Sequence, residues 1–449
     1  MSIRQQTMDM KRTIYQRLSE WKNAGDRKPL MLKGARQTGK TYLLKEFGQN
    51  EFRRIHSINF QKDKTACEIF TGSLSPQRIL ESIQLYLETK VDKTKDIIFF
   101  DEIQDCPRAL TSLKYFCEDM RELAVVSAGS LLGVTQIDEP FPVGQVSFLN
   151  LYPMSFEEFL LAVGDEISYK KLRALHYPDT IPPVLHHRLM ERLQEYFVVG
   201  GLPEVVSTYC SYMGDRPEAF ARVRAKQEDL ITAYMSDFSK YSGKIAANEI
   251  ASVFESIPAQ LARENKKFKA SQVIPQGRFS RLKSPIDWLT GAGLLIKVKI
   301  VNSGEIPFEA FTAENRIKLY LFDIGILGAL ARIPPKNLYM KSDLFSTFKG
   351  AFCENFVARE FIYSGSGQLY SWMSNTAELE FIREIDGEVY PIEVKAGHSG
   401  KLKSLNVFAA KYQVKYRTRI SARNLEFNEQ SKIHNYPLYL SYRFPINPP

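Results

Sequence analysis

One short segment, Gly-Ala-Arg-Gln-Thr-Gly-Lys-Thr at residues 34–41, constrains the fold of this chain more than any other feature. It matches the phosphate-binding pattern G-x-x-x-x-G-K-[ST] and lies between an apolar run at 29–32 and helix-forming residues at 42–47. A strand, a loop and a helix in this order point successive backbone N–H groups and a helix N-terminus at one place, which suits a triphosphate. The sequence therefore predicts a nucleotide-binding α/β domain.

Each part of this loop has an expected role. Lys40 would reach the β- and γ-phosphates of ATP, and the Thr41 hydroxyl would hold Mg²⁺. We expect the side chain of Arg36 to face solvent or a neighbouring helix rather than to take part in catalysis. The expected nucleotide contacts in this segment are Gly34, Ala35, Arg36, Gln37, Thr38, Gly39, Lys40, Thr41 and Tyr42. The sequence thus predicts ATP and Mg²⁺ as cofactors.

Two acidic residues end a fully apolar run farther along the chain. Residues 97–100 are Ile-Ile-Phe-Phe, and Asp101 and Glu102 follow them. Because ligands bind at the carboxyl ends of strands in open α/β sheets, we expect both carboxylates near the phosphate loop. Asp101 would hold Mg²⁺ through water, and Glu102 would orient or deprotonate the attacking water. Glu102 therefore distinguishes a hydrolase from a protein that only binds nucleotide.

Strand-like and helical segments alternate through the first third of the chain. The expected strands lie at 29–32, 54–60, 97–100 and 123–128, and the expected helices between them lie at 42–47, 75–87 and 107–120. This alternation predicts a parallel sheet covered on both faces. The last strand closes on Gly129 and Ser130. The Ser130 hydroxyl would either sense the γ-phosphate or belong to a tight turn.

The predicted secondary structure of the rest of the chain changes twice along the sequence. Helical spacing continues to about residue 241, and helices at 250–261 and 280–290 then precede a strand at 294–301, an order that fits a winged helix-turn-helix. A helix at 348–363, three strands and a helix at 402–412 describe a small mixed α/β domain. We therefore expect an ATPase core at 1–165, a helical lid at 166–245, a winged-helix-like segment at 246–305 and a C-terminal domain at 306–449.

Charge is distributed unevenly along the 449 residues, whose formal net charge is +9. Residues 263–299 carry nine Lys and Arg against two acids, and residues 395–423 carry eight and no acid. Two basic blocks on an otherwise acidic chain suggest a polyanion such as DNA as a partner, although two solvated faces would give the same pattern.

Other sequence features bear on the compartment. No apolar run approaches the roughly 18 residues of a membrane span, and residues 1–12 show no secretory signal. The five cysteines are scattered and have no C-x-x-C spacing, which argues against a zinc site and a disulfide framework. We expect a cytoplasmic protein that is not associated with a membrane.

A second set of candidate catalytic residues lies near the C-terminus. In the segment 391–395, period-two alternation places Glu393 and Lys395 on one face of a strand. Such a pair can hold Mg²⁺ and polarise a water against a phosphodiester. Glu380, on the preceding strand, and Glu354, on a helix, would be further metal ligands. The alternative is an amphipathic hairpin with a surface salt bridge.

These motifs together resemble one family. The chain resembles prokaryotic AAA+/STAND-related P-loop ATPases whose C-terminal domain looks like a PD-(D/E)xK nuclease. The resemblance is carried by the segments 28–41, 99–104, 128–133, 141–146, 151–159, 200–204, 322–325, 350–354 and 391–397.

The resemblance has consequences for individual residues. It implies that Pro203 contacts the nucleotide and that Glu354, Glu380, Glu393 and Lys395 occupy the nuclease-like positions. It also implies an ATPase core, a helical lid, a winged-helix segment and a restriction-endonuclease-like domain, and it allows a homo-oligomer.

Two positions depart from the family pattern. Glu380 stands where the family usually has Asp, and Gln145 stands where it usually has Arg or Lys. The extra methylene of Glu380 moves the carboxylate by more than about 1 Å, which Mg²⁺ tolerates poorly. Three hypotheses follow: an ATPase coupled to a nuclease that acts on DNA; a nucleotide-controlled switch that binds nucleic acid or protein without cutting; and a protein-interaction module.

Overall fold

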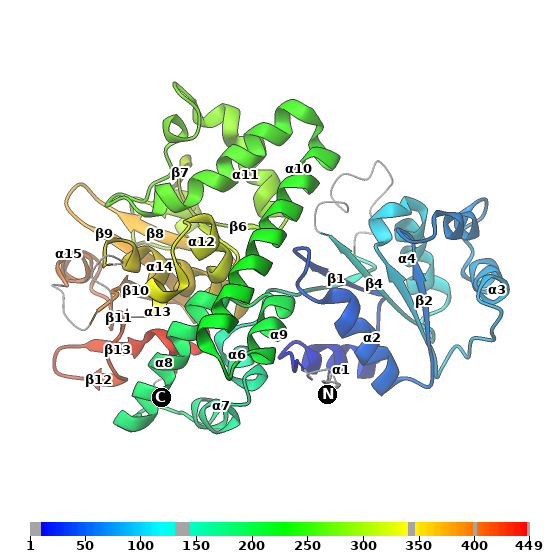
Figure 1. The fold of residues 1–449 in the computed structure, drawn as a ribbon, viewed down its shortest axis with the longest axis horizontal. Helices are drawn as coiled ribbons and strands as arrows, with labels where there is room; N and C mark the ends of the chain where they lie inside the picture. The colour runs from blue at the N-terminus through cyan, green and yellow to red at the C-terminus, as the bar shows by residue number, and fades with distance from the viewer. Residues whose placement is uncertain (1–9, 131–143, 340–345, 398–401, 447–449) are drawn as a thin grey trace. The chain divides into compact units, whose positions relative to one another are not determined.

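The computed structural model describes residues 10–130, 144–339, 346–397 and 402–446. The chain divides into two compact units, which we describe separately (Figure 1). The smaller unit contains Lys11–Tyr152 and Gly291–Gly293, and the larger contains Pro153–Thr290 and Leu294–Pro449.

The smaller unit is built on a five-stranded parallel sheet of order β2-β3-β4-β1-β5. Its strands are β1 (Leu30–Gly34), β2 (Ile55–Asn59), β3 (Ile97–Asp101), β4 (Ala124–Ser130) and β5 (Ser147–Asn150). Its helices are α1 (Tyr15–Asn23), α2 (Lys40–Glu51), α3 (Pro76–Tyr86) and α4 (Pro107–Asp119), with short 3₁₀ turns η1 (Lys64–Phe70) and η2 (Ile103–Asp105). The predicted parallel sheet is confirmed.

Two apolar clusters cover the two faces of this sheet. Side chains of α1 and α2, such as Trp21 and Phe47, pack against one face, and side chains of α3 and α4, such as Ile83 and Phe116, pack against the other. Because both faces are covered, β3 is buried at every position, which explains its uninterrupted apolar sequence. Strand β5 was not predicted, because it has only four residues and just one of them is buried.

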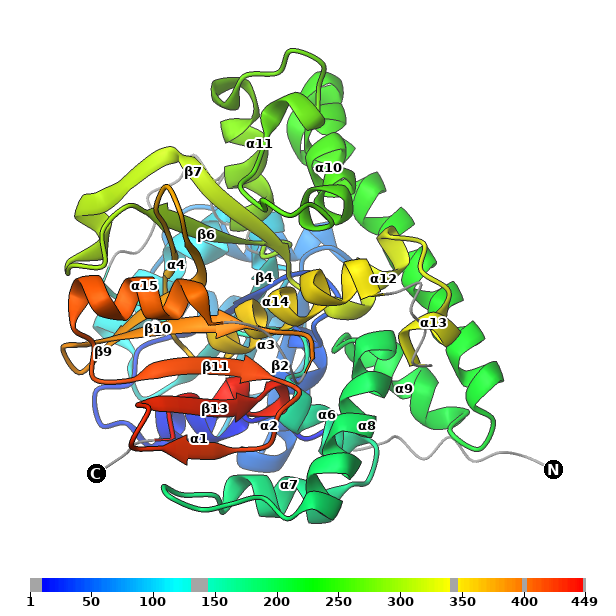
Figure 2. The same ribbon diagram turned by 90° about the vertical axis from the view of Figure 1, so that its left-hand side faces the viewer.

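The larger unit combines helices with an eight-stranded mixed sheet of order β12-β13-β11-β10-β9-β8-β6-β7. Its strands are β6 (Leu295–Val301), β7 (Thr312–Leu321), β8 (Leu369–Met373), β9 (Glu378–Ile385), β10 (Glu388–Val394), β11 (Arg417–Ser421), β12 (Glu426–Asn428) and β13 (Ile433–Pro437). In Figure 2, β7 and β6 lie at the top, and β11 and β13 lie near the bottom.

Ten helices of this unit lie in the part of the chain that the structure describes. They are α6 (Phe156–Ala162), α7 (Glu166–Arg173), α8 (Pro183–Val199), α9 (Pro203–Ser211), α10 (Arg216–Leu261), α11 (Phe279–Gly291), α12 (Ile324–Leu330), α13 (Pro335–Tyr339), α14 (Ser346–Tyr363) and α15 (Lys403–Tyr412). Short 3₁₀ turns are η3 (Ala270–Gln272), η4 (Phe308–Phe311) and η6 (Leu438–Arg443).

One expected domain boundary falls inside a continuous helix, and another falls between two strands of one sheet. The boundary at 245/246 lies within α10, a single helix of 46 residues where we expected two, because no proline interrupts it before Pro258. The boundary at 305/306 separates β6 from β7, yet these strands pair with each other and β6 also pairs in parallel with β8. The strand at 294–301, which we expected in a winged-helix-like segment, is therefore part of the C-terminal sheet as β6. The rest of the four-part division stays a prediction.

Candidate functional site

The phosphate-binding loop joins β1 to α2 in the predicted order. Gly39 precedes α2 with a φ of 92°, and Gln37 has a φ of 64°, so the loop turns through the left-handed region twice. Thr38 is fully buried, and its hydroxyl donates a hydrogen bond of 2.9 Å to the Ala35 carbonyl, which braces the turn.

Gly34 lies against the backbone of the chain segment that leaves β5. A Cβ at this position would lie 2.2 Å from the Leu151 carbonyl oxygen, and Leu151 N–H is itself bonded to the Lys33 carbonyl at 2.7 Å. Because the obstructing atom is backbone, it cannot rotate away. The first glycine of the motif therefore serves close packing of the loop.

We expect Gly34→Ala to lower the free energy of unfolding by about 1–3 kcal/mol and to weaken ATP binding, since the loop must shift to relieve the clash. Gly25→Ala in the same unit is the matched control, because a Cβ at Gly25 meets no atom within 4 Å. Thermal unfolding and titration with a fluorescent ATP analogue measure the two effects. If Gly34→Ala and Gly25→Ala have the same stability and the same affinity for ATP, Gly34 is not required for close packing of the loop.

Lys40 lies folded into the loop that it follows. Its ammonium group donates to the carbonyl oxygens of Gly34 and Ala35, at 3.0 and 2.8 Å. Burial lowers the pKa of Lys40 to about 8, and the nearby Glu102 carboxylate opposes part of that shift. The ammonium group is thus held by two neutral carbonyls of the loop, and its contact with the phosphates stays a prediction.

Asp101 meets Thr41 at the carboxyl end of β3. The Thr41 hydroxyl donates to Asp101 Oδ1 at 2.9 Å, and the Asn59 amide donates to Oδ2 at 2.8 Å. Asn59 ends β2 and pairs with Asp101 in the sheet register. A hydroxyl and a carboxylate side by side are hard oxygen donors of the kind that Mg²⁺ prefers. The structure therefore brings together the two residues expected to hold this ion.

Glu102 directly follows Asp101, the last residue of β3. Its φ is 52°, in the left-handed region, and it precedes η2. Gln104, which is nearly buried, donates from Nε2 to Glu102 Oε2 at 2.6 Å. Because the field of Glu102 acts on Lys40, the two groups lie in the same site. Gln104 was not predicted as a site residue.

A further contact supports the loop from the N-terminal side. The Arg12 guanidinium donates from Nη1 to the Thr38 carbonyl at 3.0 Å, and Nη2 donates to the Tyr152 carbonyl. Arg12 therefore joins the loop to the residue at which the smaller unit ends. No local pattern in the sequence indicates this role.

The other predicted nucleotide contacts lie in the loop, α2, β4 and α9. Tyr42, in the first turn of α2, is 49% exposed, and Arg36 is half-buried. Ser130 ends β4 opposite Gly34 in the register of β1 and β4, but its side chain lies outside the described residues. Pro203 begins α9 in the larger unit, and its contact with the nucleotide stays a prediction.

Two of the segments that carried the family resemblance are described only in part. Residues 131–133 and 141–143 lie outside the described residues. Gln145, which replaces the usual cation, donates to the Glu118 carboxylate.

The larger unit gathers the second set of predicted residues. Glu354 lies on α14, Glu380 on β9, Glu393 on β10, and Lys395 just after β10. Glu380 Oε2 accepts from Val394 N–H at 3.0 Å, and Lys395 Nζ lies 2.7 Å from Glu393 Oε1. Burial and the nearby Glu354 carboxylate raise the pKa of Glu380 to about 7. All four predicted residues therefore share one electrostatic environment, which we call the acidic cluster.

Three residues that we did not predict also enter the acidic cluster. Lys318 of β7 is fully buried and forms an ion pair with Glu378 of β9. Lys266, between α10 and η3, forms an ion pair with Glu354, and the Tyr320 hydroxyl donates to Glu354 Oε2 at 3.2 Å. Lys318 stands at the start of an apolar run in the sequence, and nothing in that pattern indicated that its side chain is buried.

The arrangement of the acidic cluster does not fit a metal ion as it stands. Among the residues that the structure describes, no three or more His, Cys, Asp or Glu side chains are grouped so that they could hold one. The Lys266 ammonium group pairs with Glu354 of the cluster instead, and the Lys318 ammonium group pairs with Glu378, which precedes Glu380 on β9.

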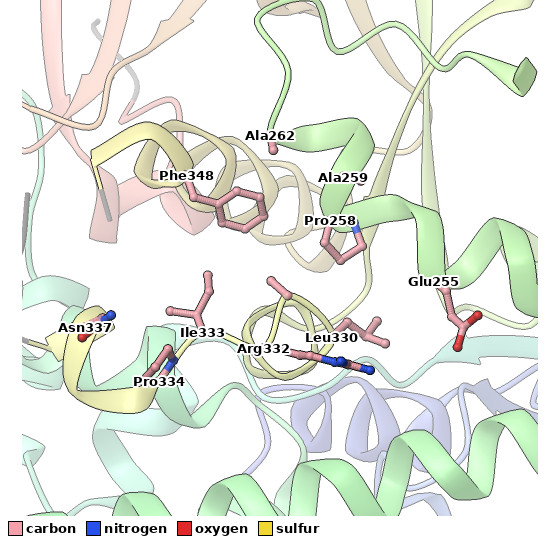
Figure 3. A pocket seen from close by; sticks show the side chains of 11 residues that line it. Glu255, Pro258, Ala259, Ala262, Leu330, Arg332, Ile333, Pro334, Asn337 and Phe348 are labelled. Carbon is pink, nitrogen blue, oxygen red and sulfur yellow. The ribbon is translucent and has the colours of Figure 1, made fainter. Parts of the chain in front are cut away.

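A separate pocket of about 530 Å³ lies in the larger unit between α10 and the chain from α12 to α14 (Figure 3). Pro258, Ile333 and Phe348 point into it, and Glu255 and Arg332 are charged residues of its lining. None of the predicted site residues lines this pocket. Among the described helices of the whole chain, none is both long enough and apolar enough to cross a membrane.

Three solved structures are similar to this chain, each with a low sequence identity and a low TM-score. The Walker-type ATPase PABY2304 of Pyrococcus abyssi is 16% identical, with 71% of this chain and 94% of that chain covered and a TM-score of 0.43. The Aeropyrum pernix Orc1 protein in complex with DNA is 13% identical, with 71% and 91% covered and a TM-score of 0.31. AMPPCP-bound DnaA from Aquifex aeolicus is 14% identical, with 62% and 86% covered and a TM-score of 0.29. These scores are too low to support an argument, and no curated protein matches the chain.

Family models match three parts of the sequence. Residues 190–337 and 349–439 match two domains of unknown function, DUF8612 and DUF4143. Residues 26–160 match the AAA domain family AAA_14, and this range contains the phosphate-binding loop, Asp101 and Glu102. The family match and the contacts of Lys40, Thr41 and Asp101 agree: residues 26–160 form an AAA-type P-loop ATPase domain, and the protein is an ATPase.

Proposed function

We propose that this ATPase uses Mg²⁺ at Thr41 and Asp101, and that its nucleotide state controls nucleic-acid binding by the larger unit. The hydrogen bond between Thr41 and Asp101, beside the buried Lys40, is the observation that carries the magnesium part of the proposal. A magnesium ion supplies Lewis-acid stabilisation of the phosphate charge when it is bound.

Residues of the phosphate site would bind the phosphates, accept the proton from water and orient the side chains that do so. Lys40 would exchange its carbonyl partners for phosphate oxygens, and the loop N–H groups would orient the same phosphates. Glu102 would accept a proton from the attacking water, while Gln104 holds its carboxylate in place. Asn59 would keep Asp101 oriented toward Thr41.

Phosphate release from ATP tests the magnesium requirement. We expect turnover with Mg²⁺ and almost none after chelation with EDTA, and we expect restoration when Mg²⁺ is added in excess. Turnover that persists in EDTA would contradict the roles of Thr41 and Asp101.

The two basic blocks differ in how their charges are paired. Five of the nine cations in 263–299 form ion pairs with acids; they are Lys266, Arg281, Lys283, Lys297 and Lys299. In the second block, Lys403, Lys411 and Lys415 are exposed and have no carboxylate partner in the described parts of the chain. We therefore place the proposed polyanion contact on α15 and the turn that follows it, rather than on the first block.

Lys411, near the end of α15, and Lys415, just after it, give a direct test of nucleic-acid binding. We expect Lys411→Ala with Lys415→Ala to weaken DNA binding about tenfold and to reduce the salt slope by roughly two, because each phosphate contact releases counterions. Lys283→Ala with Lys297→Ala is the matched control, since both lysines are already paired with acids. Fluorescence anisotropy at several salt concentrations, with ATP and with ADP, gives both quantities. A DNA affinity that changes neither with salt concentration nor between ATP and ADP would contradict the proposed nucleotide control of binding.

Metal-dependent cleavage of nucleic acid by the larger unit is the second candidate function. The element order α14-β8-β9-β10-α15-β11 supports a PD-(D/E)xK-like core, and Glu354, Glu380, Glu393 and Lys395 lie in one cluster within it. Plasmid cleavage with Mg²⁺ or Mn²⁺, lost in Lys395→Ala while ATP hydrolysis continues, would support this activity. No cleavage by an ATP-hydrolysing wild type would favour binding alone.

A further inference from the structure

We propose that Cys67 and Cys106 form a disulfide bond when hydrogen peroxide reaches the protein, and that this bond slows ATP turnover. Cys67 lies in η1, and Cys106 directly follows η2, on the segment that begins with Glu102. The formation of the bond is independent of the ATPase mechanism, whereas its effect on turnover rests on the proposed role of Glu102.

The two thiols lie side by side although they are far apart in the sequence. Cys67 Sγ donates to the carbonyl oxygen of Asp105, the residue next to Cys106, at 3.8 Å, and the Cys67 and Cys106 side chains are hydrogen-bonded to each other. Both belong to the same apolar cluster, Cys106 inside it and Cys67 packed against it. Because both are free thiols, the pair is placed to form a bond.

Hydrogen bonds of Arg108 hold the two thiol-bearing segments against each other. The Arg108 guanidinium, in α4, donates to the carbonyl oxygens of Phe70 and Gly72, at 2.8 and 2.6 Å. Phe70 ends η1 and is fully buried, and Cys106 is the residue that precedes α4. Because the end of η1 is joined to the start of α4 in this way, the folded chain keeps the two thiols within reach of each other.

The two thiols differ in exposure, which gives them different roles. Cys67 is half-buried, whereas Cys106 is only 3% exposed. Burial and the hydrogen bond with Cys67 hold the pKa of the Cys106 thiol well above its ordinary value, so Cys106 keeps its proton. Reaction with a peroxide requires both a thiolate and access from solvent. Cys67 is therefore the thiol that reacts first, and Cys106 is the resolving thiol.

The oxidation proceeds in two balanced steps. The Cys67 thiol gives its proton to solvent, its sulfur attacks one oxygen of hydrogen peroxide, the O–O bond breaks, and the hydroxide that leaves becomes water. The Cys106 sulfur then attacks the sulfur of the Cys67 sulfenic acid, the S–O bond breaks, and the leaving hydroxide takes the Cys106 proton as a second water. Two thiols are oxidised to one disulfide, and one peroxide is reduced to two waters.

The residues from Glu102 to Cys106 form one short turn, so a displacement of Cys106 reaches Glu102. Cys106 N–H donates to the Ile103 carbonyl at 3.1 Å, and Asp105 N–H donates to the Glu102 carbonyl at 3.0 Å. Gln104, in the same turn, holds the Glu102 carboxylate at 2.6 Å. A disulfide brings two sulfurs to about 2 Å, which is closer than a hydrogen bond allows. The bond therefore pulls the turn toward η1 and moves Glu102 away from the position that hydrolysis needs.

The test treats the full chain briefly with hydrogen peroxide, counts free thiols in denaturant and measures ATP turnover. We expect wild type to lose two of its five thiols and to give a peptide pair joined through Cys67 and Cys106 in non-reducing mass spectrometry. Turnover should fall about tenfold or more, because a catalytic group misplaced by about 1 Å loses most of its effect. Dithiothreitol should restore both the thiols and the rate. Cys67→Ser should keep its remaining thiols and its turnover after the same treatment.

Cys210→Ser is the matched control. Cys210 is also half-buried, but its thiol donates to the Ala162 carbonyl at 3.4 Å. This variant should lose two thiols and slow down as wild type does. Cys67→Ala replaces Cys67→Ser if that variant unfolds.

Two results would overturn the proposal. Peroxide-treated wild type would contain no bond between Cys67 and Cys106, or the bonded protein would hydrolyse ATP at the rate of the reduced protein. Glu102→Gln reports separately on the role of Glu102: wild-type turnover in that variant would contradict this role, whereas the thiol count judges bond formation by itself.

Discussion

Replacing Glu102 with glutamine is expected to slow ATP turnover by about 10²-fold or more while ATP still binds. The amide keeps the size of the side chain and can still contact Gln104, but it cannot accept a proton from water. Lys40, Thr41 and Asp101 keep their contacts, so the affinity for nucleotide should change little. Single-turnover hydrolysis measures the rate, and titration with a fluorescent ATP analogue measures the affinity.

Glu68→Gln is the matched control, because Glu68 is an exposed residue of the same unit. It should leave turnover unchanged. A Glu102→Gln variant that hydrolyses ATP at the wild-type rate would remove Glu102 from the mechanism. Loss of ATP binding together with turnover would instead show that the carboxylate supports the loop, through its field on Lys40.

The phosphate site could be predicted largely because its residues lie within strong local patterns. The loop at 34–41 and the acids after β3 sit at fixed places relative to strands, and the parallel sheet brings Thr41 and Asp101 together. Arg12, Asn59 and Gln104 could not be found in this way. Their roles depend on contacts across the sheet or on one side-chain rotamer, which no spacing in the sequence specifies.

The acidic cluster shows a different limit of sequence analysis. Alternation along β10 placed Glu393 and Lys395 together, but charge patterns cannot show which distant cation will enter a buried site. Lys266 and Lys318 are 88 and 60 residues from their carboxylate partners, Glu354 and Glu378. They turn a predicted metal site into an ion-pair network.

The turn that contains Gly200 and Gly201 is held by residues that lie far away in the sequence. Gly201 N–H donates to Asp323 Oδ2 at 2.7 Å, and its carbonyl accepts from Met154 N–H at 2.6 Å. Asp323 also caps α12 through Oδ1, with bonds from the N–H groups of Gly325 and Ile326. Three segments that carried the family resemblance therefore meet at one buried point.

The fully buried Arg359 of α14 adds to this network. Arg359 donates to the Met154 carbonyl at 3.1 Å and to the Tyr196 hydroxyl, and its neighbour Glu360 is fully buried as well. Glu360 Oε1 accepts from Phe156 N–H at 3.4 Å, and Oε2 has no partner among the described residues. Burial raises the pKa of Glu360 from 4.5 to about 8, although the Arg359 guanidinium opposes the shift.

This raised pKa predicts a stability that depends on pH. Between about pH 4.5 and pH 8 the folded chain keeps the Glu360 proton while the unfolded chain loses it. The favourable contribution of the neutral carboxyl is therefore complete below pH 4.5 and is lost as the pH rises to about 8. Glutamine, which resembles the neutral carboxyl at every pH, should remove this loss. We expect Glu360→Gln to be more stable than wild type at pH 8 by about 3–6 kcal/mol.

Urea unfolding of the full chain at pH 5, 6.5 and 8 measures the effect as the difference between Glu360→Gln and wild type. Other buried acids, including Glu157 and Asp323, also have raised pKa values, but they contribute to both proteins and cancel in that difference. The exposed Glu388→Gln is the matched control and should show no such trend. A difference that is the same at pH 5 and pH 8 would mean that Glu360 is ionised in the folded chain and that Arg359 compensates its charge. A difference that grows with pH would show that the buried junction of Met154, Gly201 and Arg359 contains a neutral carboxyl.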